Sequence, residues 1–185
     1  GKVPSTIRCM TKLYSLSIFD NRLSGTIPSI IGYLTSLYYL NLNNNLLTGT
    51  IPITIGYLTS LTELYLYDNS LSGTIPTTIG YLTSLYSLYL DYNSLSGKIP
   101  TTVGYLTSLN YLYLDNNKLT GTIPTTIVYM TSLSFLDLSE NTLSGTAPYQ
   151  LCYLFNLNSV IMYYKNFLTC SSECSIGDTS FCLPG

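Results

Sequence analysis

The chain has 185 residues, of which only 9% are charged, against roughly 25% in an average globular protein. Its net charge of -2 gives no attraction to a polyanion, so we expect no nucleic acid among its partners. Histidine is absent, which removes the commonest general base and the commonest metal ligand. We therefore expect no metal and no other cofactor.

The apolar residues give no membrane signal, although they are plentiful. Asn, Thr, Ser or Gly interrupts them every few positions, and no run approaches the ~18–20 residues that a spanning helix needs. We therefore expect no direct membrane insertion in this segment.

The first residues, Gly1 to Pro4, begin in the middle of a repeat pattern that continues along the chain. We expect an N-terminal cap to be absent. One interpretation is that this is part of a longer chain. The other is head-to-tail self-association, in which the tail of one molecule covers the first coil of the next; such a contact need not close and could build a filament.

A pattern of 24 residues then repeats without insertion. Its template is L-x-x-L-x-L-x-x-N-x-L-[ST]-G-x-I-P-x-x-I-G-Y-L-x-x. A lone unit of this size cannot bury its apolar face, so the units must stack as a solenoid. The marker residues are Gly at 1, 25, 49, 73, 97, 121 and 145, Pro at 4, 28, 52, 76, 100, 124 and 148, and Asn at 21, 45, 69, 93, 117 and 141.

Each unit predicts the same order of local structures, seen here in one copy. Leu64 and Leu66 alternate with outward residues, which is typical of a short strand. Asn69 follows at a turn, where a buried side chain can bond to backbone groups of its own and the adjacent coil. Gly73 permits a backbone angle that other residues resist. The stretch after Pro76 has apolar residues three apart and predicts a short helical turn.

The last unit departs from the template. Lys165 occupies the Asn column, Phe167 the Leu column and Thr169 the Gly column. We therefore divide the chain into a solenoid of about seven coils over residues 1–164 and a cysteine-rich C-terminal cap over residues 165–185.

The cysteines cluster near this end and suggest two disulfides and an extracellular setting. Coils stack at ~4.8 Å, so Cys9 lies roughly 29 Å from Cys152 and cannot pair with it. Cys9 is then a free thiol, or it pairs with an upstream cysteine or with a neighbouring molecule. The disulfide candidates, whose connectivity the sequence does not give, are Cys152, Cys170, Cys174 and Cys182.

The template resembles the plant-type leucine-rich repeats, whose hallmark is L-x-x-L-x-L-x-x-N-x-L-[ST]-G-x-I-P, over residues 1 to about 169. The resemblance implies an α/β-type solenoid, a curved right-handed coil with a parallel β-sheet on its concave face. It also implies a second, smaller sheet and short 3₁₀ turns on the convex face. Relatives include receptor-kinase ectodomains, polygalacturonase inhibitors and protist surface proteins, which are recognition modules or scaffolds rather than enzymes.

Three outward columns line the predicted concave sheet. An aromatic patch with hydroxyl tips and an acidic margin suits a sugar chain or an extended, somewhat basic peptide. The resemblance points to peptides and proteins. The alternative is that stacked tyrosines only stabilise a parallel ladder. The patch consists of Tyr39, Tyr65, Tyr67, Tyr89, Tyr111 and Tyr113, and its acidic border of Glu63, Asp91, Asp115 and Asp137.

Catalysis by these acids is not expected. Asp91 and Asp115 are in register on adjacent coils, and paired carboxylates can hydrolyse glycosides. An open sheet, however, offers no pocket that would raise the pKa of one of them. Calcium binding would also need a ligand-rich loop, which the sequence lacks.

Two regular arrays lie away from this face. Single threonines follow the template Gly, as at Thr74, and pairs such as Thr77-Thr78 follow the template Pro. They could present to ice, carry O-linked sugars or simply suit a solvated flank. The tyrosine of the "GYLTSL" segment occurs at 33, 57, 81 and 105, and its column continues with Tyr129 of a decayed copy and Tyr153. We expect these rings on the convex side, each covering the seam to the next coil.

The sequence thus predicts a non-enzymatic recognition or adhesion scaffold that binds a peptide, protein or glycan through its concave face. We expect it outside the cell: secreted, on the cell surface, or in the wall or matrix. The alternative is a structural subunit of an extracellular fibre or surface layer, built by end-to-end stacking and carrying O-linked sugars.

Overall fold

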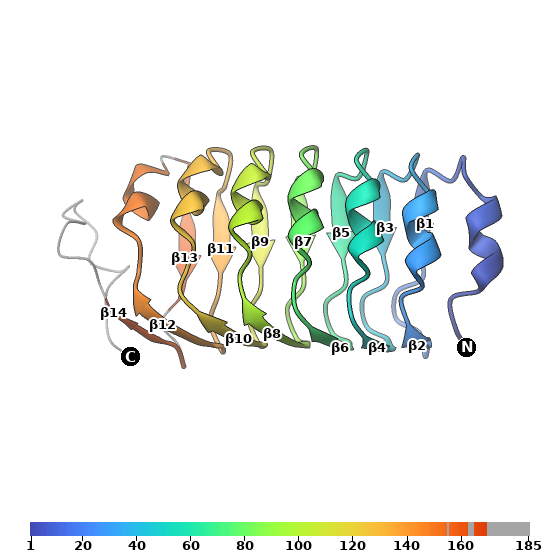
Figure 1. The fold of residues 1–185 in the computed structure, drawn as a ribbon, viewed down its shortest axis with the longest axis horizontal. Helices are drawn as coiled ribbons and strands as arrows, with labels where there is room; N and C mark the ends of the chain where they lie inside the picture. Colours follow the sequence, from blue (N-terminus) through green and yellow to red (C-terminus); the bar gives the residue numbers. More distant parts are fainter. Residues whose placement is uncertain (155, 163–164, 170–185) are drawn as a thin grey trace.

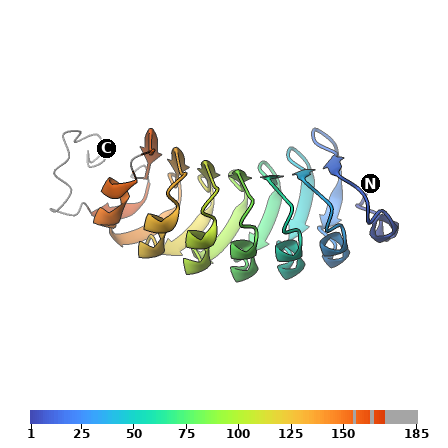
Figure 2. The same ribbon diagram turned by 90° about the horizontal axis from the view of Figure 1, so that it is seen from above.

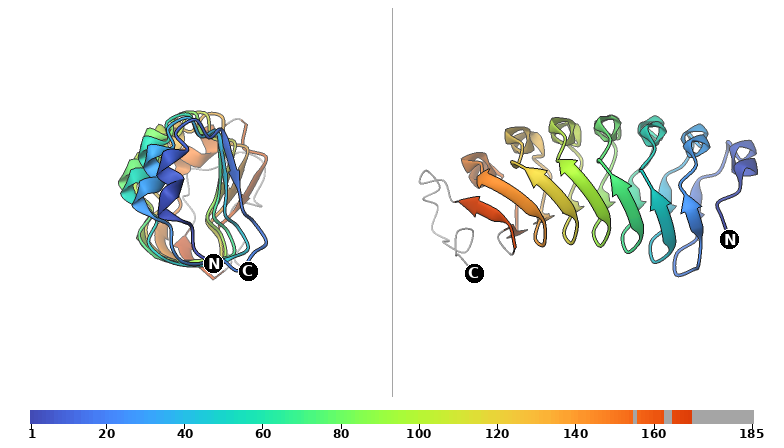
Figure 3. Two further views of the ribbon diagram at one scale, coloured as in Figure 1. Left: turned by 90° about the vertical axis from the view of Figure 1, so that its right-hand side faces the viewer. Right: turned by 60° about the horizontal axis from the view of Figure 1, so that its bottom comes forward.

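The computed structural model describes residues 1–154, 156–162 and 165–169. They form a curved solenoid in which each coil contributes one strand to a first sheet, one strand to a second sheet and one 3₁₀ turn (Figure 1). The 3₁₀ turns run along the outer side of the arc (Figure 2). Seen end-on, they lie on one side of the coil and the strands on the other (Figure 3). The predicted fold class is confirmed.

The first sheet is parallel and lies on the concave side, and its neighbouring strands are one coil apart in the sequence. Its strands are β1 (Ser15–Ser17), β3 (Tyr39–Asn41), β5 (Glu63–Tyr65), β7 (Ser87–Tyr89), β9 (Tyr111–Tyr113), β11 (Phe135–Asp137) and β13 (Ser159–Ile161).

The second sheet is also parallel and, in the described part of the chain, has as many strands as the first, although a smaller sheet was expected. Its strands are β2 (Ser24–Thr26), β4 (Leu46–Gly49), β6 (Ser70–Gly73), β8 (Ser94–Lys98), β10 (Lys118–Gly121), β12 (Thr142–Thr146) and β14 (Phe167–Thr169).

The 3₁₀ turns each follow a template proline. They are η1 (Ser5–Cys9), η2 (Ser29–Tyr33), η3 (Ile53–Tyr57), η4 (Thr77–Tyr81), η5 (Thr101–Tyr105), η6 (Thr125–Tyr129) and η7 (Tyr149–Tyr153).

The template leucines and isoleucines fill the interior of the coil and form one continuous core. Leu58, Leu61, Leu64 and Leu66 of a single coil are all fully buried. Their burial drives the stacking, because each coil covers the apolar edge of its neighbour.

The template asparagine joins consecutive coils, as predicted. The side-chain Nδ2 of Asn117 donates to the carbonyls of Leu114 at 3.2 Å and Asp115 at 3.1 Å in its own coil, and of Leu90 at 3.0 Å in the preceding coil. Its Oδ1 accepts a bond from the backbone N–H of Leu95 at 2.9 Å. One side chain therefore satisfies four backbone groups of the turn.

The glycine of the "GYLTSL" segment sets the close approach of the 3₁₀ turns. A Cβ on Gly80 would lie 2.5 Å from the carbonyl oxygen of Thr102 in the next coil. The Thr102 hydroxyl in turn donates to the carbonyl of Thr77 at 2.7 Å. The second threonine of each pair therefore serves to link coils.

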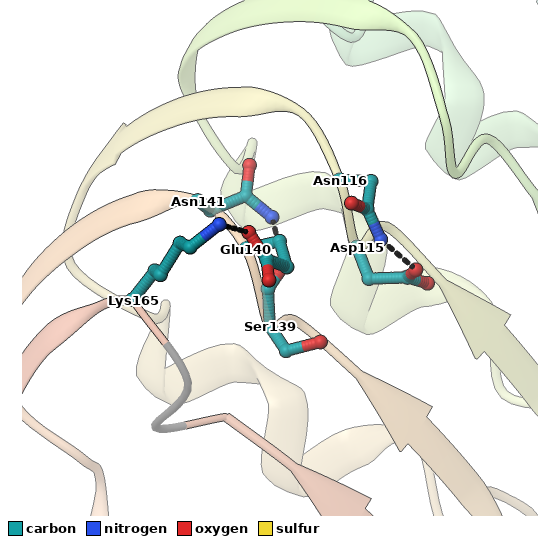
Figure 4. A network of polar contacts seen from close by, with 6 residues as sticks. All are labelled: Asp115, Asn116, Ser139, Glu140, Asn141 and Lys165. Carbon is teal, nitrogen blue, oxygen red and sulfur yellow. Dashed lines mark hydrogen bonds and ion pairs between the residues drawn. The ribbon is translucent and has the colours of Figure 1, made fainter. Parts of the chain in front are cut away.

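The assignment of the last coil by sequence was off by one residue. Asn166, not Lys165, makes the template asparagine bonds, since its Oδ1 accepts from the backbone N–H of Leu143 at 2.9 Å. Leu168 pairs with Gly145, whereas Phe167 is exposed. The spacing here is one residue longer than in the other coils. Lys165 instead forms an ion pair of 2.6 Å with Glu140 (Figure 4).

Candidate ligand-binding face

The strand register places the predicted columns side by side on the concave face. One row runs through Tyr39, Glu63, Ser87 and Tyr111 at the first position of each strand. The next row runs through Asn41, Tyr65, Tyr89, Tyr113 and Asp137 at the third position. Outward side chains from β3 to β11 therefore form one surface, which we call the concave face.

Five of the six predicted tyrosines make one run of ring contacts across four coils. The ring centroids lie 5.7 Å apart for Tyr39 and Tyr65, 4.9 Å for Tyr65 and Tyr89, and 4.5 Å for Tyr89 and Tyr113. Tyr67 joins the run through Tyr89, at 6.2 Å. The rings meet edge-on or tilted, which favours attraction between their quadrupoles.

The sixth tyrosine, Tyr111, contacts different aromatic rings. It stacks on Phe135 with centroids 5.1 Å apart and meets Tyr86 at 5.6 Å. The predicted site omitted both partners. Tyr86 belongs to a further column with Tyr14 and Tyr38, which stack at 5.1 Å, and the recurrence of tyrosine just before the strand could have revealed it.

The phenol groups of Tyr65, Tyr67, Tyr89 and Tyr113 stay neutral at physiological pH. Burial, and a hydrogen bond of 2.7 Å to Glu63, raise the pKa of Tyr65. Burial also raises the pKa of Tyr89 to about 12. The Tyr39 hydroxyl accepts a bond from Nδ2 of Asn41 at 3.0 Å. The face therefore offers neutral hydroxyl groups on half-buried rings.

Three aspartates of consecutive coils lie at the margin of the concave face, and their carboxylates differ in hydrogen bonding. Asp137 Oδ1 accepts bonds from the backbone N–H and the hydroxyl of Ser139, at 2.9 and 2.7 Å. Asp115 is 7% exposed and accepts a bond from Nδ2 of Asn116 at 2.9 Å (Figure 4). Asp91 Oδ1 is buried and has no hydrogen-bond partner among the described residues.

The environment of Asp91 corrects one sequence-based expectation. An open sheet was expected to leave the carboxyl groups unperturbed. Burial, followed by the negative charge of Asp115, raises the pKa of Asp91 from 3.8 to about 7. Burial is also the main cause that raises the pKa of Asp115. The neighbouring coils therefore desolvate these carboxylates without forming a deep pocket.

Other predicted features lie outside this face. Cys9 is exposed and free. Cys152 is partly buried, and Cys170, Cys174 and Cys182 fall outside the described residues, so the disulfide pairing stays a prediction. Within the described ranges, no three acidic or cysteine side chains are grouped closely enough to hold a metal ion.

The convex tyrosines are more than half exposed, and their covering of the seams between coils stays a prediction. Tyr33, Tyr57, Tyr81, Tyr105 and Tyr129 are each 56–63% exposed. Contact with the neighbouring coil therefore accounts for less than half of their surface.

The fold and its faces define a repeat solenoid with a parallel concave sheet. A family model of the leucine rich repeat matches residues 11–71 and 83–143. The chain belongs to the leucine-rich repeat family.

No curated protein sequence matches it. In the part of the chain that the structure describes, no helix has the length and apolar character to cross a membrane.

Several solved structures are similar to this chain. The plant peptide hormone receptor RGFR1 in complex with RGF2 has a TM-score of 0.88 and 36% identity, over 91% of this chain and 27% of the receptor chain. The ectodomain of GASSHO1/SCHENGEN3 from Arabidopsis thaliana, in complex with CASPARIAN STRIP INTEGRITY FACTOR 2, has a TM-score of 0.87 and 34% identity, over 91% and 20%. The Arabidopsis HAESA ectodomain in complex with an IDA peptide hormone has a TM-score of 0.84 and 35% identity, over 91% and 28%. The chain thus spans less than a third of each of these receptor chains.

Proposed function

We propose that the chain is a non-enzymatic recognition scaffold that acts outside the cell and binds an extended peptide or protein segment through its concave face. The observation that carries this proposal is the run of contacting tyrosines on β3, β5, β7 and β9, bordered by carboxylates. Half-buried tyrosines offer apolar area together with hydroxyl groups, and their rings lose little conformational freedom on binding.

The similar structures support a peptide rather than another ligand. RGFR1 is a plant peptide hormone receptor in complex with RGF2, and the HAESA ectodomain is in complex with an IDA peptide hormone. A parallel sheet that curves along one side of a solenoid presents a long surface, which an extended chain can follow across several coils.

The experiment is a selection of random 12-residue peptides displayed on phage, with the purified chain as bait and the heat-unfolded chain as counter-bait. We expect a small set of related peptides that compete with one another for one site. Failure to enrich any peptide on the folded bait would contradict the proposal. The end-to-end fibre alternative would instead give large particles in light scattering of the purified chain.

A further inference from the structure

The concave face carries acidic side chains and no basic side chains in its three outward columns. None of the seven Lys and Arg residues of the chain lies in its three columns. Asp91 is surrounded by Asp68, Asp115 and Asp137, whose negative charges all act to raise its pKa. The phenols of Tyr67, Tyr89 and Tyr113 complete the titratable groups around it, and they are neutral at physiological pH. No cation on this face compensates these carboxylates.

The third outward column of the concave face lies two residues beyond the second and contains two buried acceptors that also lack a donor. This column runs through Asn43, Tyr67, Asp91, Asp115 and Ser139. The two acceptors are Oδ1 of Asp91 and Oδ1 of Asn43, and Tyr67 occupies the same column between these residues. The Asn43 side chain is deeply buried, with the residue only 2% exposed. Buried acceptors in native proteins are nearly always paired with protein groups or ordered water, so the unpaired Oδ1 of Asp91 is open to a donor from water or from a ligand.

We propose that this column is the subsite for one cationic side chain, arginine or lysine, of the peptide ligand. Its charged head would lie against Asp91 and Asp115, and its stem would pack on Tyr89 and Tyr113, whose rings are 4.5 Å apart. The subsite rests on the proposed function, which it makes more specific. An organic cation fits better than a metal ion, because aromatic rings flank the column and the described residues offer no group of three metal ligands.

The subsite makes binding depend on pH in a defined direction. The pKa of Asp91 in the free protein is about 7, so the carboxylate is mostly ionised at pH 8 and mostly neutral at pH 6. A cation is attracted only by the ionised form. The affinity therefore falls from pH 8 to pH 6 by at most about tenfold, the factor by which the ionised fraction of a group with this pKa falls.

The test uses the peptides recovered by the selection at pH 8. We expect one position to be enriched in Arg or Lys, and a synthetic peptide with norleucine there to bind at least tenfold more weakly. Asp91→Asn should cause a similar loss and abolish the pH dependence. Asn43 already occupies the same column, so an amide at position 91 suits the repeat. The matched control is Asp68→Asn, which removes the same charge from an exposed neighbour.

The outcomes separate this subsite from the proposed function. The subsite would be overturned if the peptides carried no enriched cation, or if the Asp91→Asn and Asp68→Asn variants bound with equal affinity. Either result would still agree with peptide recognition by the concave face. Recovery of no peptide would overturn both. A further experiment titrates the protein with calcium alone. Calcium binding that is lost in Asp91→Asn would show a metal site and contradict the proposal that the column binds a cationic side chain.

Discussion

At the residue scale, the position before the template asparagine has an unusual backbone. Asp20, Asn44, Asp68 and Asn116 adopt a positive φ of 51–52° there, in the left-handed region that Asn and Asp tolerate. Tyr92 stands in the same column with a φ of 48°. Glu140 and Lys165 also have a positive φ in this column, and Tyr92 is its aromatic residue among those that the structure describes. The repeat therefore holds a bulky ring in a conformation that costs free energy.

Replacing Tyr92 by Asn should stabilise the protein. The ring is 56% exposed, so little packing is lost. The free-energy cost of the left-handed backbone at this position falls by about 1 kcal/mol, because Asn tolerates that conformation. Thermal unfolding followed by circular dichroism would show a higher melting temperature. Tyr105→Asn, at a similarly exposed ring without a positive φ, should give no such gain. A lower melting temperature for the Tyr92 variant would contradict the strain argument.

Asp91 should make stability depend on pH. Its folded pKa of about 7 lies above the ordinary 3.8, so the folded state binds the proton more tightly than the unfolded state does. Stability therefore falls as the pH rises from about 4 to 7, and the loss is complete above pH 7. Asp91→Asn removes this term, so its melting temperature should exceed that of the wild type by more at pH 8 than at pH 5. An equal difference at both pH values would refute it.

At the element scale, most of the architecture follows from the sequence. The period of 24, the Leu-x-Leu strand and the glycines predict every strand row of the concave sheet and its register. The last coil escaped prediction because one extra residue shifts Asn166 and Leu168, and only the bonds they make reveal the shift. Sequence also missed the burial of Asp91, which depends on how side chains of neighbouring coils cover it.

Asn117 should be among the least replaceable polar residues. Asn117→Ala leaves three carbonyls and the N–H of Leu95 without their partner, which we expect to cost about 3 kcal/mol or more. Asn117→Asp keeps the acceptor but loses the donors, so it should be nearly as damaging. Urea unfolding measures both, with the exposed Ser108→Ala as control. A fully stable Asp variant would contradict the role of the donated bonds.

At the scale of the whole molecule, the solenoid separates two sets of tyrosines. Those of the convex turns are regular and more than half exposed, and Tyr33, Tyr57, Tyr81 and Tyr105 follow the glycine that permits close packing of the coils. Those of the concave face vary from coil to coil and contact one another beside the carboxylates. The regular set repeats with the scaffold, and the irregular set is suited to recognition.

The central claim is that recognition belongs to the concave set. The most direct measurement is the dissociation constant of one selected peptide for two triple variants, after circular dichroism has shown that both remain folded. Replacing Tyr65, Tyr89 and Tyr113 by Ser should weaken binding at least a hundredfold, which corresponds to about 3 kcal/mol. Replacing Tyr57, Tyr81 and Tyr105 by Ser should leave the affinity within about twofold, a change of less than about 0.5 kcal/mol, because these rings lie on the convex side. Equal affinity of the concave variant and the wild type would contradict the account.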